Sequence, residues 1–214
     1  MSGGKGLILG LHAKARSGKD TFANYLVNIL SSEYGREFKT TAFAYRLKQM
    51  CLEHFNLNRE QLWGDDKEKI DLRYSKIGKG SNIPEFWTPR EIMQNLGSFY
   101  RSIDYDFWVR KTKEHWEYHN YPDVVITDVR HINECEYVKE NGILIKIVRE
   151  DANEIHNMQH ESETALDNQS DDYFDITVFN NGTLEDLQKA AEEAAEKVLW
   201  LEKLKEKGRE YNGE

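Results

Sequence analysis

Short apolar runs alternate along this chain with longer segments in which apolar residues recur every three or four positions. The apolar runs predict strands at 7–11, 39–44, 123–128, 143–148 and 173–179. The recurring segments predict helices at about 22–30, 45–55, 88–99, 107–118, 132–140 and 183–201. Strands that are apolar almost throughout and alternate with helices are typical of parallel sheets covered on both faces. The pattern therefore predicts an α/β fold built on a five-stranded parallel sheet.

Two of the predicted helices carry clear start signals. Thr88 is a good N-cap residue, Pro89 suits the first helical position, and Glu91 complements the helix dipole. Thr183 and Asp186 have the spacing of a capping box at the start of the last helix. These signals predict where both helices begin.

Two polar stretches interrupt the predicted sheet. The first, at 58–87, is rich in charges and glycines, which predicts a mobile insertion rather than core. The second, at 149–172, follows the fourth strand. We therefore expect a single domain whose core is formed by 1–43, 119–149 and 173–214, with inserted segments at 44–118 and 150–172.

Composition narrows the class of protein. The chain has 214 residues, 31% of them charged, and a formal net charge of -9, which argues against broad non-specific binding to nucleic acid polymers. Cys51 and Cys135 have neither metal-site spacing nor a disulfide framework, so a reducing cytoplasm is expected. No signal-peptide pattern occurs, and no apolar run approaches the roughly 20 residues of a membrane span. A cytoplasmic protein that does not bind membranes is expected.

The stretch 6–21, GLILGLHAKARSGKDT, combines a buried strand, a loop and the start of an amphipathic helix. This is the layout of a P-loop, in which backbone N–H groups and the helix N-terminus hold phosphate oxygens. The usual P-loop pattern requires Gly at position 13 and Ser or Thr at position 20, where this chain has Ala13 and Asp20. The alternative is a solvated basic turn. The residues expected to bind phosphate are Ala13, Lys14, Ala15, Arg16, Ser17, Gly18, Lys19, Asp20 and Thr21.

Three residues at the end of this loop have candidate roles in binding a nucleotide. Lys19 would neutralise the β- and γ-phosphates, unless it is only an exposed lysine at a helix start. Asp20 would repel a polyphosphate unless Mg²⁺ lies between them, so it is either a metal contact or a helix cap. Thr21 could supply the hydroxyl that the usual Ser or Thr provides.

Further candidates follow the other predicted strands. Asp128 ends an apolar strand in the Walker-B position, where it would hold the metal shell; the alternative is an aspartate that caps the strand–loop junction. Because ligands bind beyond the carboxyl ends of parallel strands, Asp128, Arg149 and the pair Asn180–Asn181 are expected beside the loop. Transfer of a phosphoryl group requires cations, and the candidates are Arg90, Arg101, Arg130 and Arg149.

Six blocks run in family order over nearly the whole chain, at 17–21, 88–97, 106–108, 128–134, 160–167 and 180–182. With them, the chain resembles the phage-type deoxynucleoside monophosphate kinases, a branch of the P-loop nucleoside monophosphate kinases. That family itself carries Gly-Lys-Asp-Thr, which accounts for Asp20. The resemblance implies a P-loop three-layer sandwich with a helical insertion for the acceptor nucleotide at 44–118 and a short lid at 150–172.

The resemblance also implies roles for individual residues. The 13–21 loop would bind the phosphates of ATP, Arg149 would close over them with the lid, and Asn180 and Asn181 would border the adenine. Asp20 and Asp128 would contact Mg²⁺, and His160 and Glu163 would order the lid. The acceptor would be bound by Lys48, Arg90, Gln94, Arg101, Asp106, Trp108 and Arg130, although Trp108 could equally be a core residue. Lys19, Arg90, Arg130, Arg149 and Asp128 would act in catalysis.

The expected reaction is Mg²⁺-dependent transfer of the γ-phosphate of ATP to a deoxynucleoside monophosphate. The expected partners are small nucleotides, and a homodimer is expected only because dimers are common among soluble enzymes. Two alternatives stay open. The Gly-Lys-Asp variant is similar to that of animal phosphomevalonate kinases, and a nucleotide-binding module without transfer activity would need the same loop.

Overall fold

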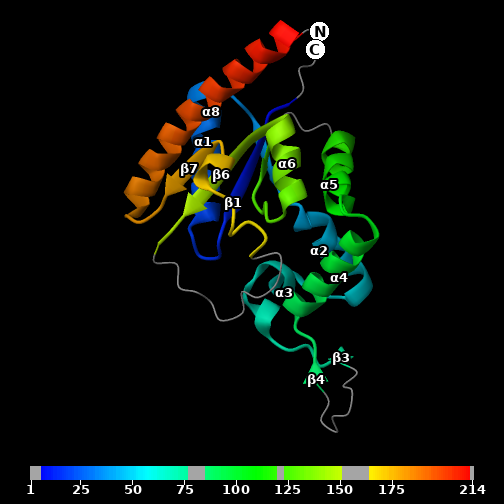
Figure 1. The fold of residues 1–214 in the computed structure, drawn as a ribbon. Helices are drawn as coiled ribbons and strands as arrows, with labels where there is room; N and C mark the ends of the chain where they lie inside the picture. Colours follow the sequence, from blue (N-terminus) through cyan, green and yellow to red (C-terminus); the bar gives the residue numbers. More distant parts are fainter. Residues whose placement is uncertain (1–5, 77–84, 120–122, 151–163, 213–214) are drawn as a thin grey trace. The chain divides into compact units, whose positions relative to one another are not determined.

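The computed structural model describes residues 6–76, 85–119, 123–150 and 164–212 (Figure 1). These residues form two compact units, one made of Met1–Phe43 with Lys113–Glu214 and the other of Ala44–Thr112. No helix in the part of the chain that the structure describes has both the length and the apolar character needed to span a membrane. Each unit is built around its own hydrophobic cluster.

The first unit contains a five-stranded sheet in which every pair of neighbouring strands is parallel. The strand order is β2-β5-β1-β6-β7, so the first strand of the chain is the central one. The strands are β1 (Ile8–Ala13), β2 (Phe38–Thr41), β5 (Asp123–Ile126), β6 (Gly142–Val148) and β7 (Ile176–Phe179). The predicted five-stranded parallel sheet is confirmed.

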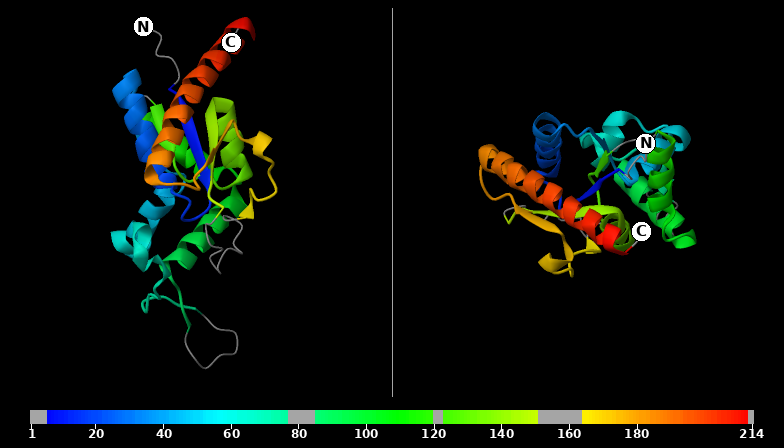
Figure 2. Two further views of the ribbon diagram at one scale, coloured as in Figure 1. Left: turned by 90° about the vertical axis from the view of Figure 1, so that its left-hand side faces the viewer. Right: turned by 90° about the horizontal axis from the view of Figure 1, so that it is seen from above.

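Helices cover both faces of this sheet. On one face, α1 (Lys19–Tyr34) and α8 (Leu184–Asn212) pack side by side, as two further views show (Figure 2). Their apolar residues share a buried cluster with Leu9 and Leu11 of β1. Side chains alternate between the faces of a strand, so Gly10 faces the other layer. A Cβ at Gly10 would lie 2.7 Å from both methyl carbons of Val138 in α6 (Ile132–Asn141), which therefore packs directly on the central strand.

The second unit is mainly helical. Its elements are α2 (Ala44–Phe55), α3 (Arg59–Trp63), the 3-10 helix η1 (Asp65–Glu68), β3 (Ser75–Lys76), β4 (Glu85–Phe86) and α4 (Pro89–Ile103). The next helix, α5 (Phe107–Tyr118), begins in this unit. Residues from all of the longer helices form its core, which contains Leu47, Cys51, Leu57, Leu62, Ile92 and Trp108.

The local start signals are confirmed. Thr88 and Glu91 form a complete capping box at the start of α4, with Pro89 in the first turn. The hydroxyl of Thr183 accepts a hydrogen bond from the N–H of Asp186, whose carboxylate in turn accepts one from the N–H of Thr183.

The expectation that 58–87 lies outside the core is wrong for part of that segment. Asn58 and Gln61 form a capping box that starts α3, and this helix buries Leu62 to 1% exposure. The N–H of Asp71 also donates to the carbonyl of Trp87, 2.8 Å away, which closes the base of the β3–β4 hairpin. The prediction failed because this short helix is polar except for its one buried residue, Leu62, and the bordering Trp63. Residues 77–84 lie outside the described part of the chain.

Several strand boundaries also differ from the prediction. β1 continues to Ala13, two residues beyond its expected end, so Ala13 lies in the strand and not in the loop that follows it. β2 ends at Thr41, and the apolar residues that follow it lead into α2. β5 ends at Ile126, two residues before Asp128. The last strand begins at Ile176, because the 3-10 helix η2 (Asp171–Tyr173) occupies the expected start. Apolar content alone does not distinguish these turns from strand.

Candidate active site

The carboxyl ends of the five parallel strands lie along one edge of the sheet. The loop at 14–18 follows β1 at this edge, 127–131 follows β5, Arg149 follows β6 and Asn180 follows β7. Hydrogen bonds link these segments to each other. The amide Nδ2 of Asn180 donates to the carbonyl of Ser17 (2.8 Å), and its N–H donates to the carbonyl of Val148 (2.8 Å). The sequence-based expectation that these segments share one edge is therefore confirmed.

The loop after β1 turns sharply to start α1. Arg16 and Gly18 have positive φ angles of 61° and 83°. A Cβ at Gly18 would lie 2.4 Å from Nδ2 of Asn180, so both the backbone angle and the available space require glycine there. Gly18 is also the N-cap of α1, and no side chain caps the first turn. The N–H groups of this turn and the helix dipole are thus available to an anion.

Ser17 gives a second sign that the loop is shaped for a ligand. The residue is 1% exposed, and its Oγ has no hydrogen-bond partner among the residues that the structure describes. Buried hydroxyl groups are nearly always hydrogen-bonded in folded proteins. A phosphate group in the loop would fit this unsatisfied donor and the uncapped helix end.

Lys19 and Asp20 form an ion pair at the start of α1. The lysine side chain is largely buried, whereas the Asp20 side chain is 86% exposed. The alternative that Asp20 caps the helix is wrong, because the N-cap is Gly18 and Asp20 lies inside the first turn. Its charge there complements the helix dipole. Thr21 is partly buried in the same turn.

The segment after β5 is held by hydrogen bonds at every residue. Asp128 Oδ1 accepts from the N–H of Phe43 (2.6 Å), and the N–H of Val129 donates to the carbonyl of Leu11 (3.1 Å). The two residues after Val129 are held by Glu134. Its buried carboxylate accepts hydrogen bonds from the backbone N–H groups of Arg130 (2.7 Å) and His131 (3.1 Å). Asp128 therefore does cap the strand–loop junction, with one of its two oxygens. Its expected contact with a metal stays a prediction.

Two further candidates at this edge, Lys14 and Asn181, contact residues of the segment expected to form the lid. Lys14 Nζ lies 3.0 Å from Asp167 Oδ1, and Asn181 Oδ1 accepts from the N–H of Glu150 (3.0 Å). Arg149 is exposed. His160 and Glu163 fall outside the described residues, as does most of the expected lid. The adenine contacts of Asn180 and Asn181 stay predictions.

Among the described residues, no magnesium site is made of protein ligands alone. The described ranges contain no group of three or more His, Cys, Asp or Glu side chains placed to hold a metal ion. Mg²⁺ in phosphoryl-transfer sites is usually held by one or two carboxylates together with substrate phosphates and water. Asp20 and Asp128, at the edge formed by the carboxyl ends of the strands, are compatible with that mode of binding.

The residues expected to bind the acceptor lie mainly in the second unit. Arg90 forms an ion pair with Glu68 of η1. Lys48 Nζ lies 5.0 Å from the centre of the Trp63 ring. Trp108 is 3% exposed and its indole N–H donates to the carbonyl of Gly97 (3.0 Å), so it is a core residue.

Gln94 and Arg101 share one face of α4 with Arg90 and Gly97, because these positions are three or four residues apart. Asp106 precedes α5, and its carbonyl accepts from the N–H of Arg110 (2.9 Å). The roles of these residues toward an acceptor stay predictions.

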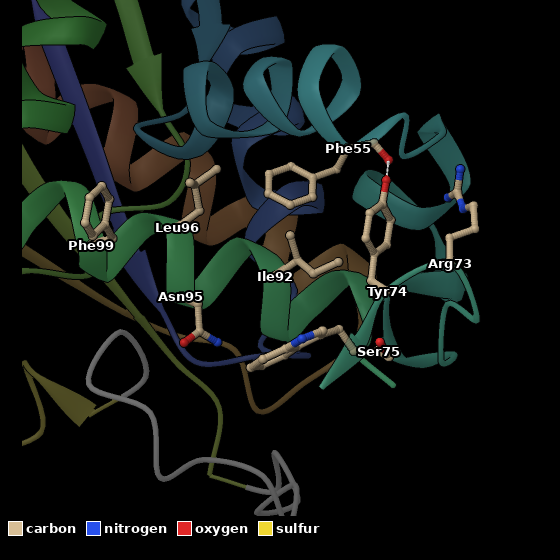
Figure 3. A pocket seen from close by; sticks show the side chains of 9 residues that line it. Phe55, Arg73, Tyr74, Ser75, Ile92, Asn95, Leu96 and Phe99 are labelled. Atoms are coloured by element: carbon tan, nitrogen blue, oxygen red, sulfur yellow. Dashed lines mark hydrogen bonds between the residues drawn. The ribbon is translucent and has the colours of Figure 1, made fainter. Parts of the chain in front are cut away.

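The second unit also contains a pocket of about 520 Å³ (Figure 3). It is lined by Phe55, Arg73, Tyr74, Ser75, Trp87, Ile92, Asn95, Leu96 and Phe99. The hydroxyl of Tyr74 donates to the carbonyl of Phe55, which fixes one wall. Arg73 pairs with Asp71 and holds the pKa of that carboxyl well below its ordinary value of 3.8. The volume is in the range of small-molecule sites.

None of the residues expected to bind the acceptor lines this pocket. Its α4 residues, which include Asn95 and Phe99, lie on the helix face opposite the one that carries Arg90 and Gln94. The sequence analysis missed the pocket because its walls come from α2, the hairpin and α4. No local motif brings these three segments together.

Comparison with known proteins gives two concordant results. The family model described as deoxynucleotide monophosphate kinase matches residues 36–191. Over 199 residues, 84% of this chain and 91% of the relative, the chain is 31% identical to a protein of Acanthamoeba polyphaga mimivirus named "Putative deoxynucleotide monophosphate kinase". The family match begins after the 6–21 loop, so the loop geometry is a separate observation. The chain belongs to the deoxynucleotide monophosphate kinase family.

Proposed function

We propose that this kinase transfers the γ-phosphate of ATP, bound with Mg²⁺, to a deoxynucleoside 5′-monophosphate, giving the diphosphate and ADP. The observation that carries the proposal is the loop between β1 and α1. It combines two left-handed residues, a helix start without a side-chain cap and the buried hydroxyl of Ser17, the last two without a hydrogen-bond partner among the described residues. These features suit a polyphosphate, and family membership supplies the acceptor class.

The chain's own residues would act mainly by binding and orienting. The N–H groups of the loop and Lys19 would hold the β- and γ-phosphates, while Arg90 and Arg130 would bind the acceptor phosphate. An oxygen of that phosphate attacks directly, so no protein nucleophile is required. Asp128 and Asp20 would hold Mg²⁺, which when bound neutralises charge on the β- and γ-oxygens. Arg149 would stabilise the charge that spreads over the transferring oxygens.

The test is acceptor-dependent release of ADP from ATP, measured with each deoxy- and ribonucleoside monophosphate and with phosphomevalonate. We expect turnover with deoxynucleoside monophosphates that disappears when Mg²⁺ is chelated. Lys19→Ala should lower kcat/KM by at least about a hundredfold, because it removes the cation at the transferring phosphate. Lys39→Ala is the matched control, since Lys39 is an exposed lysine paired with Glu37 in the same unit.

Two results would contradict the proposal. Turnover with phosphomevalonate but with no deoxynucleoside monophosphate would show that the acceptor is not a nucleotide. ATP binding without ADP release for any acceptor would indicate a nucleotide-binding module.

A further inference from the structure

His12 lies near the carboxyl end of the central strand, and the proposed chemistry gives it no role. It belongs to β1 and lies two residues before the loop. Its Nδ1 lies 2.9 Å from the carbonyl oxygen of Val129. Because a carbonyl only accepts, Nδ1 must carry the proton and donate it. The central strand is thereby joined to the residue directly before Arg130.

Val129 is held by β1 from both sides of its backbone. Its N–H donates to the carbonyl of Leu11 (3.1 Å), and its own carbonyl accepts from His12. Its side chain is 1% exposed, and a Cβ at Gly10 would lie 3.0 Å from one of its methyl carbons. The Val129 carbonyl belongs to the peptide group that joins Val129 to Arg130. Without the His12 side chain, this carbonyl would lose the hydrogen bond from Nδ1.

His12 also contacts Phe174, which lies two residues after the expected lid segment 150–172. Its ring stacks on Phe174, with centroids 5.5 Å apart and planes 17° from parallel. Phe174 is buried directly after η2, and its N–H donates to the carbonyl of Asp171 (3.1 Å). The Nζ of Lys146 in β6 lies over the Phe174 ring and donates a hydrogen bond to the carboxylate of Asp171. The imidazole is therefore held between 128–131 and 171–174.

We propose that His12 is a positioning residue for the acceptor phosphate, because its ring N–H fixes the Val129 carbonyl and thereby the start of Arg130. The proposal rests on the proposed function, which gives Arg130 the acceptor phosphate. Burial lowers the pKa of His12 below its ordinary value, against the opposing effect of the hydrogen bond to Val129; the charges of Lys146 and Arg130 also lower this pKa, and that of Asp167 raises it. The contact requires a proton on Nδ1, which the neutral Nδ1–H tautomer of the ring supplies.

Two substitutions separate the two contacts of the ring. His12→Phe keeps an aromatic ring to stack on Phe174 but removes the N–H, whereas His12→Asn keeps an amide N–H near Nδ1 but removes the ring. We expect His12→Phe to raise KM for the acceptor about three- to tenfold, the usual worth of one hydrogen bond, with KM for ATP unchanged. His12→Asn should keep the wild-type acceptor KM. His54→Asn, at an exposed histidine in α2, is the control.

A double-mutant cycle with Arg130→Ala identifies the residue through which His12 acts. In the Arg130→Ala background, His12→Phe should have no further effect on acceptor KM. If His12→Phe does not fold, His12→Leu, which also lacks the N–H, takes its place in both assays.

The inference is overturned if the variant without the N–H keeps the wild-type acceptor KM, if His12→Asn loses as much as His12→Phe, or if both KM values rise together. A wild-type enzyme that releases no acceptor-dependent ADP overturns the proposed function instead, and this inference with it. An active wild type with an unaffected His12→Phe variant overturns this inference alone.

Discussion

The side-chain amide of Asn180 donates a 2.8 Å hydrogen bond to the backbone carbonyl of Ser17, 163 residues earlier in the chain. This bond joins the 14–18 loop to the residue that follows β7. Asn180 is 5% exposed and its backbone N–H bonds Val148, so the anchor itself is fixed. The loop thus depends on the last strand for its shape.

Asn180→Ala should weaken ATP binding. The substitution leaves the buried carbonyl of Ser17 without a partner, which costs about 1–3 kcal/mol. We expect a raised KM for ATP, together with a lower melting temperature. Asn28→Ala is the control, because Asn28 is an exposed asparagine in α1 of the same unit. Equal ATP affinity in wild type and Asn180→Ala would show that the anchor is unimportant.

Gly18→Ala tests the space in the loop, with Gly35→Ala as its matched control. Both glycines are left-handed, with φ of 83° and 65°, so alanine strains the backbone by about 1 kcal/mol or more at either position. A Cβ meets Asn180 at Gly18, but meets nothing within 4 Å at Gly35. Both variants should melt at lower temperature, and only Gly18→Ala should lose ATP binding in calorimetry. Comparable ATP affinities for the two would contradict the packed loop.

Asp128→Asn distinguishes a metal contact from a structural cap. The asparagine side chain keeps an oxygen that can accept the N–H of Phe43, while the charge is removed. We expect a nearly unchanged melting temperature but a loss of at least about tenfold in kcat, with a higher Mg²⁺ concentration needed for half-maximal rate. A variant with full activity would leave Asp128 only the capping role.

Arg90→Ala tests the role in acceptor binding that we propose for Arg90 of the second unit. Loss of a cation that binds the acceptor phosphate should raise KM for the acceptor about tenfold or more, with KM for ATP little changed. Arg110→Ala is the control, because Arg110 is also ion-paired with a carboxylate in this unit, that of Asp104. If the two variants behave alike, Arg90 is only a surface ion pair with Glu68.

The stability of the fold should fall with acidity through His12. Its pKa is lowered from 6.5 in the folded protein, mainly by burial, so below that pH the unfolded chain takes up a proton that the folded chain does not. The contribution of His12 is therefore complete above pH 6.5 and decreases as the pH falls toward the lower folded value. The melting temperature of wild type should exceed that of His12→Phe most clearly at about pH 7.5, with a narrower gap at about pH 5.5. A gap independent of pH would contradict this assignment.

Local features of the fold were readable from the sequence. The helix start at Thr88 depends on residues within four positions, and the apolar run at 143–148 indicates a buried strand by composition alone. Both are properties of contiguous segments, which a linear pattern contains. The short helix after Asn58 was missed because its one buried leucine gives too weak a period.

Contacts between distant segments were not readable in the same way. His12 directly precedes the loop pattern and matches no motif, and only the pairing of β1 beside β5 brings it to Val129. The pocket beside Asn95 and Phe99 likewise requires the hairpin to fold next to α4. Strand order and tertiary packing decide such contacts.

The central position of β1 has a consequence for how the protein is made. This strand leaves the ribosome before the other strands of the sheet, yet the N–H of Leu7 bonds Asp123, 116 residues later, and Ile8 pairs with Val124 and Gly142. At about 5–20 residues per second, the nascent chain carries an unpaired apolar strand for roughly 6–23 s. A product truncated before residue 123 would never bury it. An apolar strand that waits so long for its partners is a segment to which chaperones can bind during synthesis.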